Sequence, residues 1–192
     1  MYHTYFKRIL DIISCLSLIL IFFPIMIVIF ILVWLKIGFP IFFHKRPGLN
    51  NKIFVLYKFK TLHDAPPGTP EKKRQSSLGD FLRKTGLDEL PQLFNVIQNK
   101  MSLIGPRPLL VEYLDKYSVY EKKRHLVKPG ITGLAQISPN KSGIKLWKKS
   151  IKLDLFYVSN VSFLLDIKIL FETVKLVILK KKQYQDFNKF YE

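Results

Sequence analysis

Two adjacent carboxylates, Asp88 and Glu89, stand just before a proline in a stretch of apolar residues. The apolar positions of this stretch recur at helical spacing, at Leu87, Leu90, Leu93, Phe94 and Ile97. Pro91 is compatible with a first helical turn, where its missing N–H is not needed. We therefore expect the pair at or just before a helix N-terminus, where exposed amide groups favour a carboxylate or a phosphate ligand. An acidic helix cap is the simplest explanation of these residues alone.

A carboxylate beside cations can also do phosphoryl chemistry, because it can attack phosphorus and form an acyl phosphate. Such an attack brings two anions together, so cations must offset the repulsion. Mg²⁺ held by one carboxylate, with an arginine on the phosphate oxygens, would do so. Arg107 lies between Pro106 and Pro108, which would fix its backbone and prepare its guanidinium for bidentate contact. The alternative is a tight turn that only connects two helices.

Other familiar catalytic and binding patterns are absent from the sequence. It contains no glycine-rich phosphate loop, no paired-cysteine zinc site and no nucleophile elbow. The histidines are scattered without metal-ligand spacing, at His3, His44, His63 and His125. No reading helix or aromatic strand motif indicates nucleic-acid binding. Glycoside hydrolysis needs carboxylates on two sides of a bond, whereas adjacent ones usually point apart.

The chain is strongly basic, with 192 residues and a formal charge of +17. Its length suits one domain with an appendage. Only Lys7, Arg8 and Asp11 among the charged residues precede Lys36, so the excess lies almost entirely after that point. Such an excess suits nucleic acid, nucleotides or an anionic membrane surface. The single cysteine, Cys15, excludes a disulfide framework and fits a reducing compartment.

Residues 12–35 carry no charged side chain and are mostly Ile, Leu, Phe and Val. As one helix they would be about 36 Å long, against a hydrocarbon core of roughly 30 Å. No small-residue cleavage site ends the run, which argues against a signal peptide. Pro24 at its middle would bend the helix, and the basic residues that flank both ends prefer the cytoplasm. We therefore expect residues 1–36 to form a re-entrant helix–break–helix hairpin; a single span with the same chemistry is the alternative.

Beyond residue 36 the pattern predicts a mixed domain. Two β-prone runs, 39–43 and 53–60, flank a turn rich in Pro, Gly and Asn and predict a β-hairpin. Lys58 and Lys60 share one face of the second run, where they would meet phosphate or simply face solvent. Residues 64–77 predict a loop. Helices are expected at 77–84, 109–127, 146–160 and 163–179, the last lying in the membrane interface or packing on the protein's own core.

Taken together, these features resemble the bacterial sugar transferase family, the small monotopic phosphoglycosyl transferases. The matching segments, in order, are Lys7-Arg8 with Asp11, the apolar run bent at Pro24, Arg46-Pro47-Gly48, Tyr57 to Thr61, Leu87 to Asn95, Met101 to Pro108, and Pro129 to Gln136. Each motif alone is weak, but their order and spacing are specific.

The resemblance implies transfer of a phospho-sugar from a UDP-sugar to polyprenol (undecaprenyl) phosphate, with release of UMP. It places the protein at the cytoplasmic face of the bacterial inner membrane as a monotopic enzyme. Asp88 would be the nucleophile of a ping-pong reaction and form a covalent phospho-sugar intermediate. Glu89, with Asp88, would hold Mg²⁺, while Arg107 and Arg83 would bind substrate phosphate. Lys58 and Lys60 complete the expected substrate-binding residues.

The chain departs from the family pattern at three places. Phe23 precedes Pro24 where the family usually has serine, and Asn99-Lys100 stands where it has Gly-Asp. Ser138-Pro139-Asn140-Lys141 replaces a typical Asn-Gly-Arg. Lys141 would then take the place of a phosphate-binding arginine as a point charge without the arginine fork.

We thus predict an α+β, mostly helical protein. Its parts would be a membrane hairpin (1–36), a small cytoplasmic-face transferase domain with a β-hairpin and interfacial helices (37–182), and a tail (183–192). The expected partners are a UDP-sugar, polyprenol phosphate and anionic lipids, without nucleic acid. The alternative from another class is a non-catalytic basic membrane-surface protein that binds nucleic acid or partners. The sequence leaves the sugar, the glycan pathway and the oligomeric state open.

Overall fold

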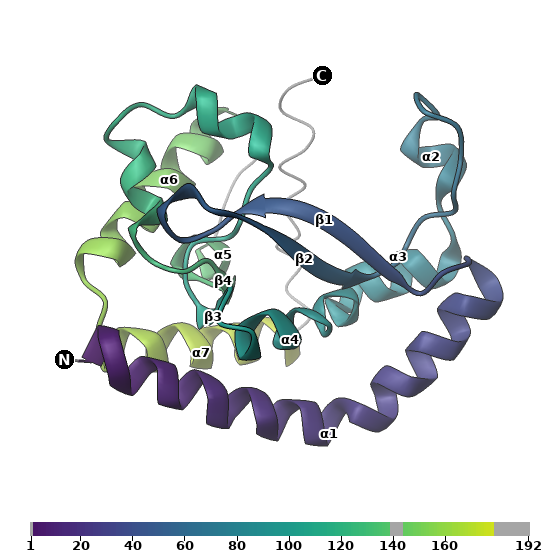
Figure 1. Ribbon diagram of the computed structural model, residues 1–192, viewed down its shortest axis with the longest axis horizontal. Helices are drawn as coiled ribbons and strands as arrows, with labels where there is room; N and C mark the ends of the chain where they lie inside the picture. Colours follow the sequence, from purple (N-terminus) through teal and green to yellow (C-terminus); the bar gives the residue numbers. More distant parts are fainter. Residues whose placement is uncertain (1, 139–143, 179–192) are drawn as a thin grey trace.

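The computed structural model describes residues 2–138 and 144–178 (Figure 1). The helices are α1 (Lys7–Lys36), α2 (Glu71–Arg74), α3 (Ser77–Thr85), α4 (Gln92–Ile97), α5 (Leu134–Ile137), α6 (Ile144–Ser159) and α7 (Phe163–Ile178). The strands are β1 (Ile41–Pro47), β2 (Ile53–Phe59), β3 (Ser102–Ile104) and β4 (Gly130–Thr132). A π-helical turn (Tyr2–Phe6) precedes α1, and 3-10 turns lie at Leu49–Asn51, Leu87–Glu89, Val111–Lys116 and Glu121–Leu126. The prediction of a mostly helical protein with a short antiparallel hairpin is confirmed. The tail at 183–192 and Lys141 lie outside the described residues.

The helix break expected at Pro24 is not observed. α1 is one continuous helix with Pro24 inside it, not two helical arms joined by a non-helical residue. Proline removes one backbone bond and crowds the carbonyl four residues earlier, which bends a helix without ending it when neighbouring turns stay packed. Figure 1 shows α1 as a shallow arc, with both ends turned toward the rest of the molecule. In the described part of the chain, α1 alone is long and apolar enough to cross a membrane.

Two apolar clusters hold the concave side of α1 against the domain. Cys15 on the first half of the helix packs with the β2 residue Leu56 and the α4 residue Val96. Val33 on the second half packs with Phe59 of β2 and Leu82 of α3. The opposite side of α1 is exposed along its length, with large apolar residues such as Ile13, Leu20, Ile31 and Leu35. The arc therefore follows the core, and its outer side carries an uncovered apolar surface.

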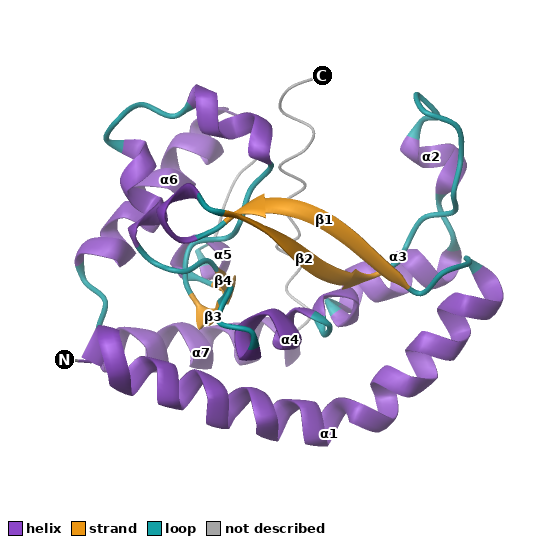
Figure 2. Cartoon of the chain, viewed as in Figure 1, coloured by secondary structure: helices purple, strands orange, loops and turns teal. Residues whose placement is uncertain are grey.

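The hairpin pairs β1 with β2 in antiparallel register, from Ile41 opposite Phe59 to Pro47 opposite Ile53 (Figure 2). β3 and β4 form a second, parallel pair. On β2, Phe54 and Leu56 are buried in the core, and Lys58 follows on the same side of the strand, two residues further. The hairpin therefore carries a lysine directly to the edge of the core.

Two C-terminal expectations have different outcomes. The helix expected at 109–127 is wrong, since two 3-10 turns form there; the Glu121 carboxylate accepts bonds from the Ser118 backbone N–H and hydroxyl, which stabilises a turn between them. The helix expected at 163–179 is confirmed as α7. Its Asp166 and Ile169 are buried against the core, while its Leu164 side is exposed.

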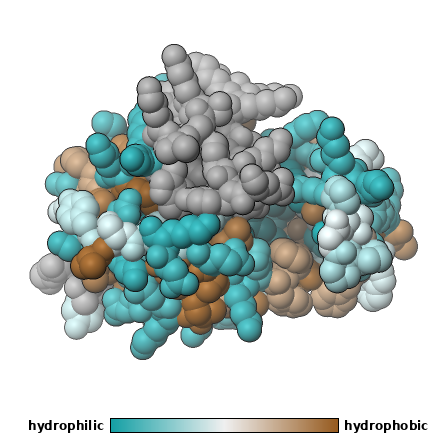
Figure 3. All heavy atoms as spheres, turned by 90° about the horizontal axis from the view of Figure 1, so that it is seen from above, coloured by the Kyte–Doolittle hydropathy of each residue, from teal (hydrophilic) through white to brown (hydrophobic). Residues whose placement is uncertain are grey.

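Figure 3 shows the face of the molecule that points away from α1. Where grey atoms do not cover it, this face is mostly hydrophilic with isolated apolar patches.

Candidate active site

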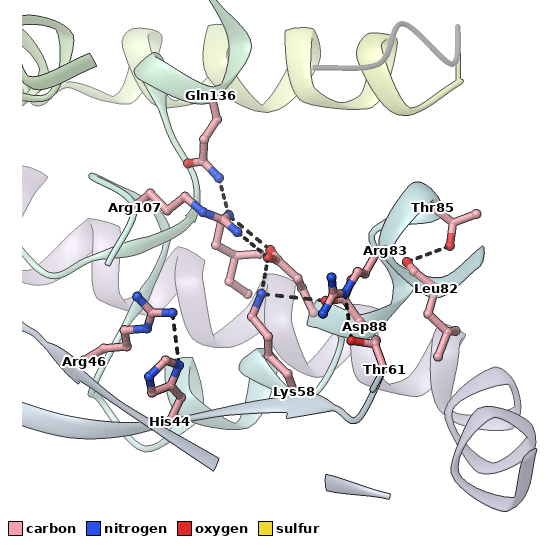
Figure 4. Close-up of polar contacts among 12 residues, drawn as sticks. His44, Arg46, Lys58, Thr61, Leu82, Arg83, Thr85, Asp88, Arg107 and Gln136 are labelled. Atoms are coloured by element: carbon pink, nitrogen blue, oxygen red, sulfur yellow. Dashed lines mark hydrogen bonds and ion pairs between the residues drawn. The ribbon is translucent and has the colours of Figure 1, made fainter. Parts of the chain in front are cut away.

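The carboxylate pair lies in the 3-10 turn between α3 and α4. The Thr85 hydroxyl donates to the carbonyl of Leu82 at the end of α3 (Figure 4) and also to the carbonyl of Phe81. Gly86 then reverses the chain with a φ of +75°, in the left-handed region that glycine adopts without strain. The turn Leu87–Glu89 follows, and Pro91 leads into α4. The expected position of the pair just before a helix is confirmed.

Glu89 is the point where two cations meet. Its Oε1 lies 2.7 Å from Lys58 Nζ and 2.7 Å from Arg107 Nη2, and Arg107 Nη1 lies 3.5 Å from Oε2. Burial alone would raise the pKa of Glu89, but Arg107 and Lys58 outweigh it and lower the pKa to about 2. Glu89 is therefore a permanent carboxylate that fixes two cations beside Asp88.

Asp88 has a different environment, although it is the next residue. Its side chain is almost fully buried, and Lys58 Nζ lies 3.7 Å from its Oδ2. Oδ1 is buried and has no hydrogen-bond partner among the described residues. Burial, reinforced by the neighbouring Glu89 charge, raises the pKa of Asp88 to about 6 against the opposing effect of Lys58 and Arg107. A buried carboxylate oxygen without a donor is unusual and is available to a metal ion or a reacting phosphorus.

The buried side-chain amide of Asn95 joins the strand that carries Lys58 to the helix that follows Asp88 and Glu89. From α4, its Oδ1 accepts the Tyr57 backbone N–H at 2.9 Å and its Nδ2 donates to the Val55 carbonyl at 2.8 Å. These bonds attach α4 to β2 on either side of Leu56, so Lys58 is held over the turn that carries Asp88. This role of Asn95 was not predicted from the sequence. The only signal was a polar residue inside an apolar helical stretch.

The turn that carries Arg107 depends on close backbone packing. A Cβ on Gly105 would lie 2.4 Å from the Lys128 carbonyl oxygen, so only glycine fits between β3 and the segment before β4. Pro106 and Pro108 restrict the backbone on either side of Arg107. The predicted proximity of Arg107 to the carboxylate pair is thus built by a rigid turn.

The remaining predicted site residues are not all brought to the pair. Arg83 lies near enough to lower the pKa of Asp88, but its guanidinium donates to the Thr61 hydroxyl at 2.8 Å and pairs with Glu71 of α2. Lys60 pairs with the exposed Asp64. The structure therefore gathers Lys58, Arg107 and the two carboxylates, with Arg83 at the margin.

Arg46 on β1 is an additional cation of this region. Arg46 belongs to the Arg46-Pro47-Gly48 segment that resembles the family pattern, but it was not predicted as a site residue. Burial, followed by the neighbouring Arg107 charge, lowers the pKa of Arg46 to about 10. Its Nη2 lies 3.1 Å from His44 Nδ1 (Figure 4). The cations of the site therefore come from both strands of the hairpin and from the Arg107 turn.

The donor set suits a hard cation held together with a substrate. No group of three or more His, Cys, Asp or Glu residues that could hold a metal occurs in residues 2–138 and 144–178. Mg²⁺ is commonly held by one or two carboxylates, with water and substrate phosphate completing the shell. Asp88, through its unpartnered Oδ1, and Glu89 can supply such carboxylate ligands. The residues present therefore fit Mg²⁺ arriving with a phosphate substrate.

The environment of Asp88 predicts a pH-dependent stability effect. At about pH 7.5, Asp88→Asn should stabilise the fold by up to about 3 kcal/mol, because the ionised carboxylate is disfavoured above its folded pKa of about 6. This gain should shrink as the pH falls toward the usual aspartate value of 3.8, below which both folded and unfolded states are protonated. Melting temperatures of both proteins across this range measure it. A destabilised variant, or a pH-independent difference, would contradict the assignment; the exposed Asp115→Asn serves as the control.

The amino-acid sequence of the chain is similar to those of several known proteins. The family model described as "Bacterial sugar transferase" matches residues 2–180. The chain is 44% identical over 180 residues to the uncharacterized sugar transferase EpsL of Bacillus subtilis, covering 91% of this chain and 88% of EpsL. It is 39% identical over 159 residues to galactosyl transferase CpsE of Streptococcus agalactiae, covering 74% and 35%. It is 36% identical over 192 residues to the UDP-glucose:undecaprenyl-phosphate glucose-1-phosphate transferase of Klebsiella pneumoniae, covering 93% and 41%. The chain thus spans most of the first relative but less than half of the other two.

Proposed function

Because the chain belongs to the bacterial sugar transferase family, we propose that it transfers a sugar phosphate from a UDP-sugar to polyprenol phosphate and releases UMP. The Klebsiella relative is named for a reaction of this kind, with UDP-glucose and undecaprenyl phosphate. The observation that carries the proposal is the asymmetry of the carboxylate pair. Glu89 is neutralised by two cations, whereas the buried Asp88 keeps one oxygen without a partner.

The reaction takes place in two steps on Asp88. An Asp88 oxygen attacks the sugar-bearing phosphorus of the donor, an O–P bond forms, and the bond to the UMP oxygen breaks. UMP leaves as a stable anion, so this step needs no strong general acid. A phosphate oxygen of the polyprenol then attacks the same phosphorus, the Asp88–phosphorus bond breaks, and the polyprenyl diphosphate sugar is released. One carboxylate therefore serves a soluble donor and a lipid acceptor in turn.

The residues around Asp88 lower the electrostatic cost of this attack. Lys58 and Arg107 are already fixed by Glu89 beside the nucleophile, so they need little rearrangement when phosphate charge arrives. Arg83 can exchange its Glu71 partner for a donor phosphate oxygen. Mg²⁺, held by Asp88 and Glu89 together with the substrate, would supply further charge neutralisation on the phosphate oxygens.

The membrane placement of α1 belongs to the same proposal. The arc of the helix, its basic flanks and its exposed outer apolar side support a segment that enters the cytoplasmic leaflet and returns. In the background Cys15→Ala, we expect Tyr5→Cys and Lys45→Cys to react with an impermeant maleimide only from the cytoplasmic side. Both positions are exposed and lie on opposite sides of α1 in the sequence. Labelling of the two from opposite sides would instead show a single span.

The test of the proposed function is UMP release from a panel of UDP-sugars. Purified protein in detergent or nanodiscs should release UMP from at least one donor when polyprenol phosphate and Mg²⁺ are present, and EDTA should stop it. A basic membrane-surface protein without catalysis would release none from any donor, and its anion binding would fall steeply with salt whether or not Asp88 is present. That outcome would reject the proposal.

A further inference from the structure

A second arginine, Arg124, lies deep in the protein behind the Arg107 turn. Its side chain is 2% exposed. Nη2 and Nε donate to Asp154 Oδ2 at 2.6 and 3.0 Å, and Nη1 donates to the Tyr117 hydroxyl at 3.1 Å. Nη2 also donates to the backbone carbonyl of Arg107 at 2.8 Å. A buried guanidinium is costly unless its donors are satisfied, and here every nitrogen has a partner.

These contacts join three segments that are distant in the sequence. Arg124 lies in the 3-10 turn Glu121–Leu126, and Asp154 lies on α6. The Arg107 carbonyl belongs to the loop that follows β3. Ion pairing with Asp154 alone would only attach a turn to a helix. The bond to the carbonyl connects this buried pair to the residue whose guanidinium contacts Glu89 at 2.7 Å.

The bond from Arg124 to the Arg107 carbonyl acts on a segment whose backbone is already restricted. Pro106 and Pro108 leave the Arg107 backbone few alternative conformations, so fixing one carbonyl largely fixes the direction in which its side chain leaves. The Arg107 side chain is 27% exposed, so its far end is not held by packing on all sides. The placement of the Arg107 guanidinium against Glu89 therefore depends on the position of the Arg107 backbone.

We propose that Arg124 is a positioning residue for catalysis: by holding the Arg107 carbonyl, it sets the Arg107 guanidinium against Glu89 and the substrate phosphate. Its effect on rate rests on the proposed function, and it reaches the reacting atoms only through Arg107. Displacing a catalytic group by about 1 Å can cost on the order of a hundredfold in rate, so a correctly folded variant should still be slow.

The test is a double-mutant cycle between Arg124→Lys and Arg107→Ala. Lysine keeps a charge for Asp154 but lacks the fork that reaches the Asp154, Tyr117 and Arg107 oxygens together. Arg124→Lys alone should lower kcat about ten- to a hundredfold, with a smaller change in KM for the donor. In the Arg107→Ala background the same change should cost less than about twofold, because the backbone carbonyl remains but the guanidinium that it positions is gone. Equal factors in both backgrounds would show a purely structural role and overturn the proposal.

A matched control cuts another buried ion pair. Lys7 pairs with Asp166 at 2.6 Å and joins α1 to α7. Lys7→Met should lower the melting temperature but act by the same factor with and without Arg107. If Arg124→Lys fails to fold, Tyr117→Phe removes one of the Arg124 partners with little change of shape. Its smaller loss of kcat should likewise disappear in the Arg107→Ala background, and persistence of the loss there would contradict the proposal.

A second readout does not depend on activity. If Arg124 places Arg107 on Glu89, the loss of unfolding free energy caused by Glu89→Gln should fall by at least about half in the Arg124→Lys background. An unchanged loss would refute the positioning role even in a protein that releases no UMP. Conversely, coupling in this cycle without any UMP release from the wild type would reject the proposed reaction and leave the positioning inference standing.

Discussion

Asp88→Asn is expected to lower UMP release from the donor at least about a thousandfold while leaving the protein folded. The amide is nearly isosteric with the carboxyl, but it is a poor nucleophile toward phosphorus and carries no charge to hold a cation. The buried position disfavours the ionised carboxylate, so the variant should also be at least as stable as the wild type at neutral pH. Initial rates of UMP release, with circular dichroism and melting temperature for the same samples, measure both effects.

The exposed Asp115→Asn provides the control, because it makes the same chemical change at a carboxylate outside the site. It should leave both rate and melting temperature close to those of the wild type. An Asp88→Asn protein that keeps more than about a tenth of the activity would show that another group attacks the donor. Loss of activity together with loss of the fold would assign Asp88 a structural role instead.

Glu89→Gln is expected to lower kcat about a hundredfold or more, through a different physical cause. The neutral amide no longer attracts Lys58 and Arg107, whose bonds to Oε1 are both 2.7 Å long in the wild type. Two partly buried cations then lose their anionic partner, so a lower melting temperature is expected too. The nucleophile remains, but the preorganised positive charge beside it is lost.

This variant also makes a prediction about pH. Because Asp88 must be ionised to attack, wild-type kcat/KM for the donor should fall as the pH drops through about 6, its folded pKa. The Glu89 charge raises the pKa of Asp88, so the residual activity of Glu89→Gln should fall at a lower pH than that of the wild type. Glu112→Gln, at a carboxylate outside the pair, should keep the wild-type profile. An acid limb that stays in place or moves upward in Glu89→Gln would contradict the coupling of the two carboxylates.

Local sequence patterns predicted the elements that build the site. The hairpin followed from β-prone runs around a Pro-Gly-Asn turn, and the position of Asp88 followed from apolar spacing and a proline. The interruption of the helix expected at 109–127 was not predicted. It coincides with a Ser118–Glu121 hydrogen bond inside a stretch of helical periodicity, and the periodicity does not report this bond. The continuity of α1 through Pro24 was missed for a related reason. Packing of both halves of the helix on the same core, with Cys15 and Val33 fully buried, is a tertiary effect that local propensity does not contain.

The site shows the same division. Asp88, Glu89 and Arg107 were recognisable by type and spacing, and their proximity is a property of the fold that the motif order anticipated. Asn95 and Arg124 were not predicted, since each acts through bonds to the backbone of a distant segment. Such bonds depend on which carbonyls and amides the fold brings near, and no period or spacing in the sequence reports them.

The central claim is that Asp88 itself becomes bonded to phosphorus, and a trapping experiment tests it most directly. The protein is incubated with a UDP-sugar and Mg²⁺ without any polyprenol phosphate, then quenched in acid and digested for mass spectrometry. We expect about one UMP released per active enzyme, and a sugar phosphate on the peptide that contains Asp88, which disappears when polyprenol phosphate is added before the quench. UMP release that requires the acceptor from the start, with no modified Asp88 at any time, would contradict the account.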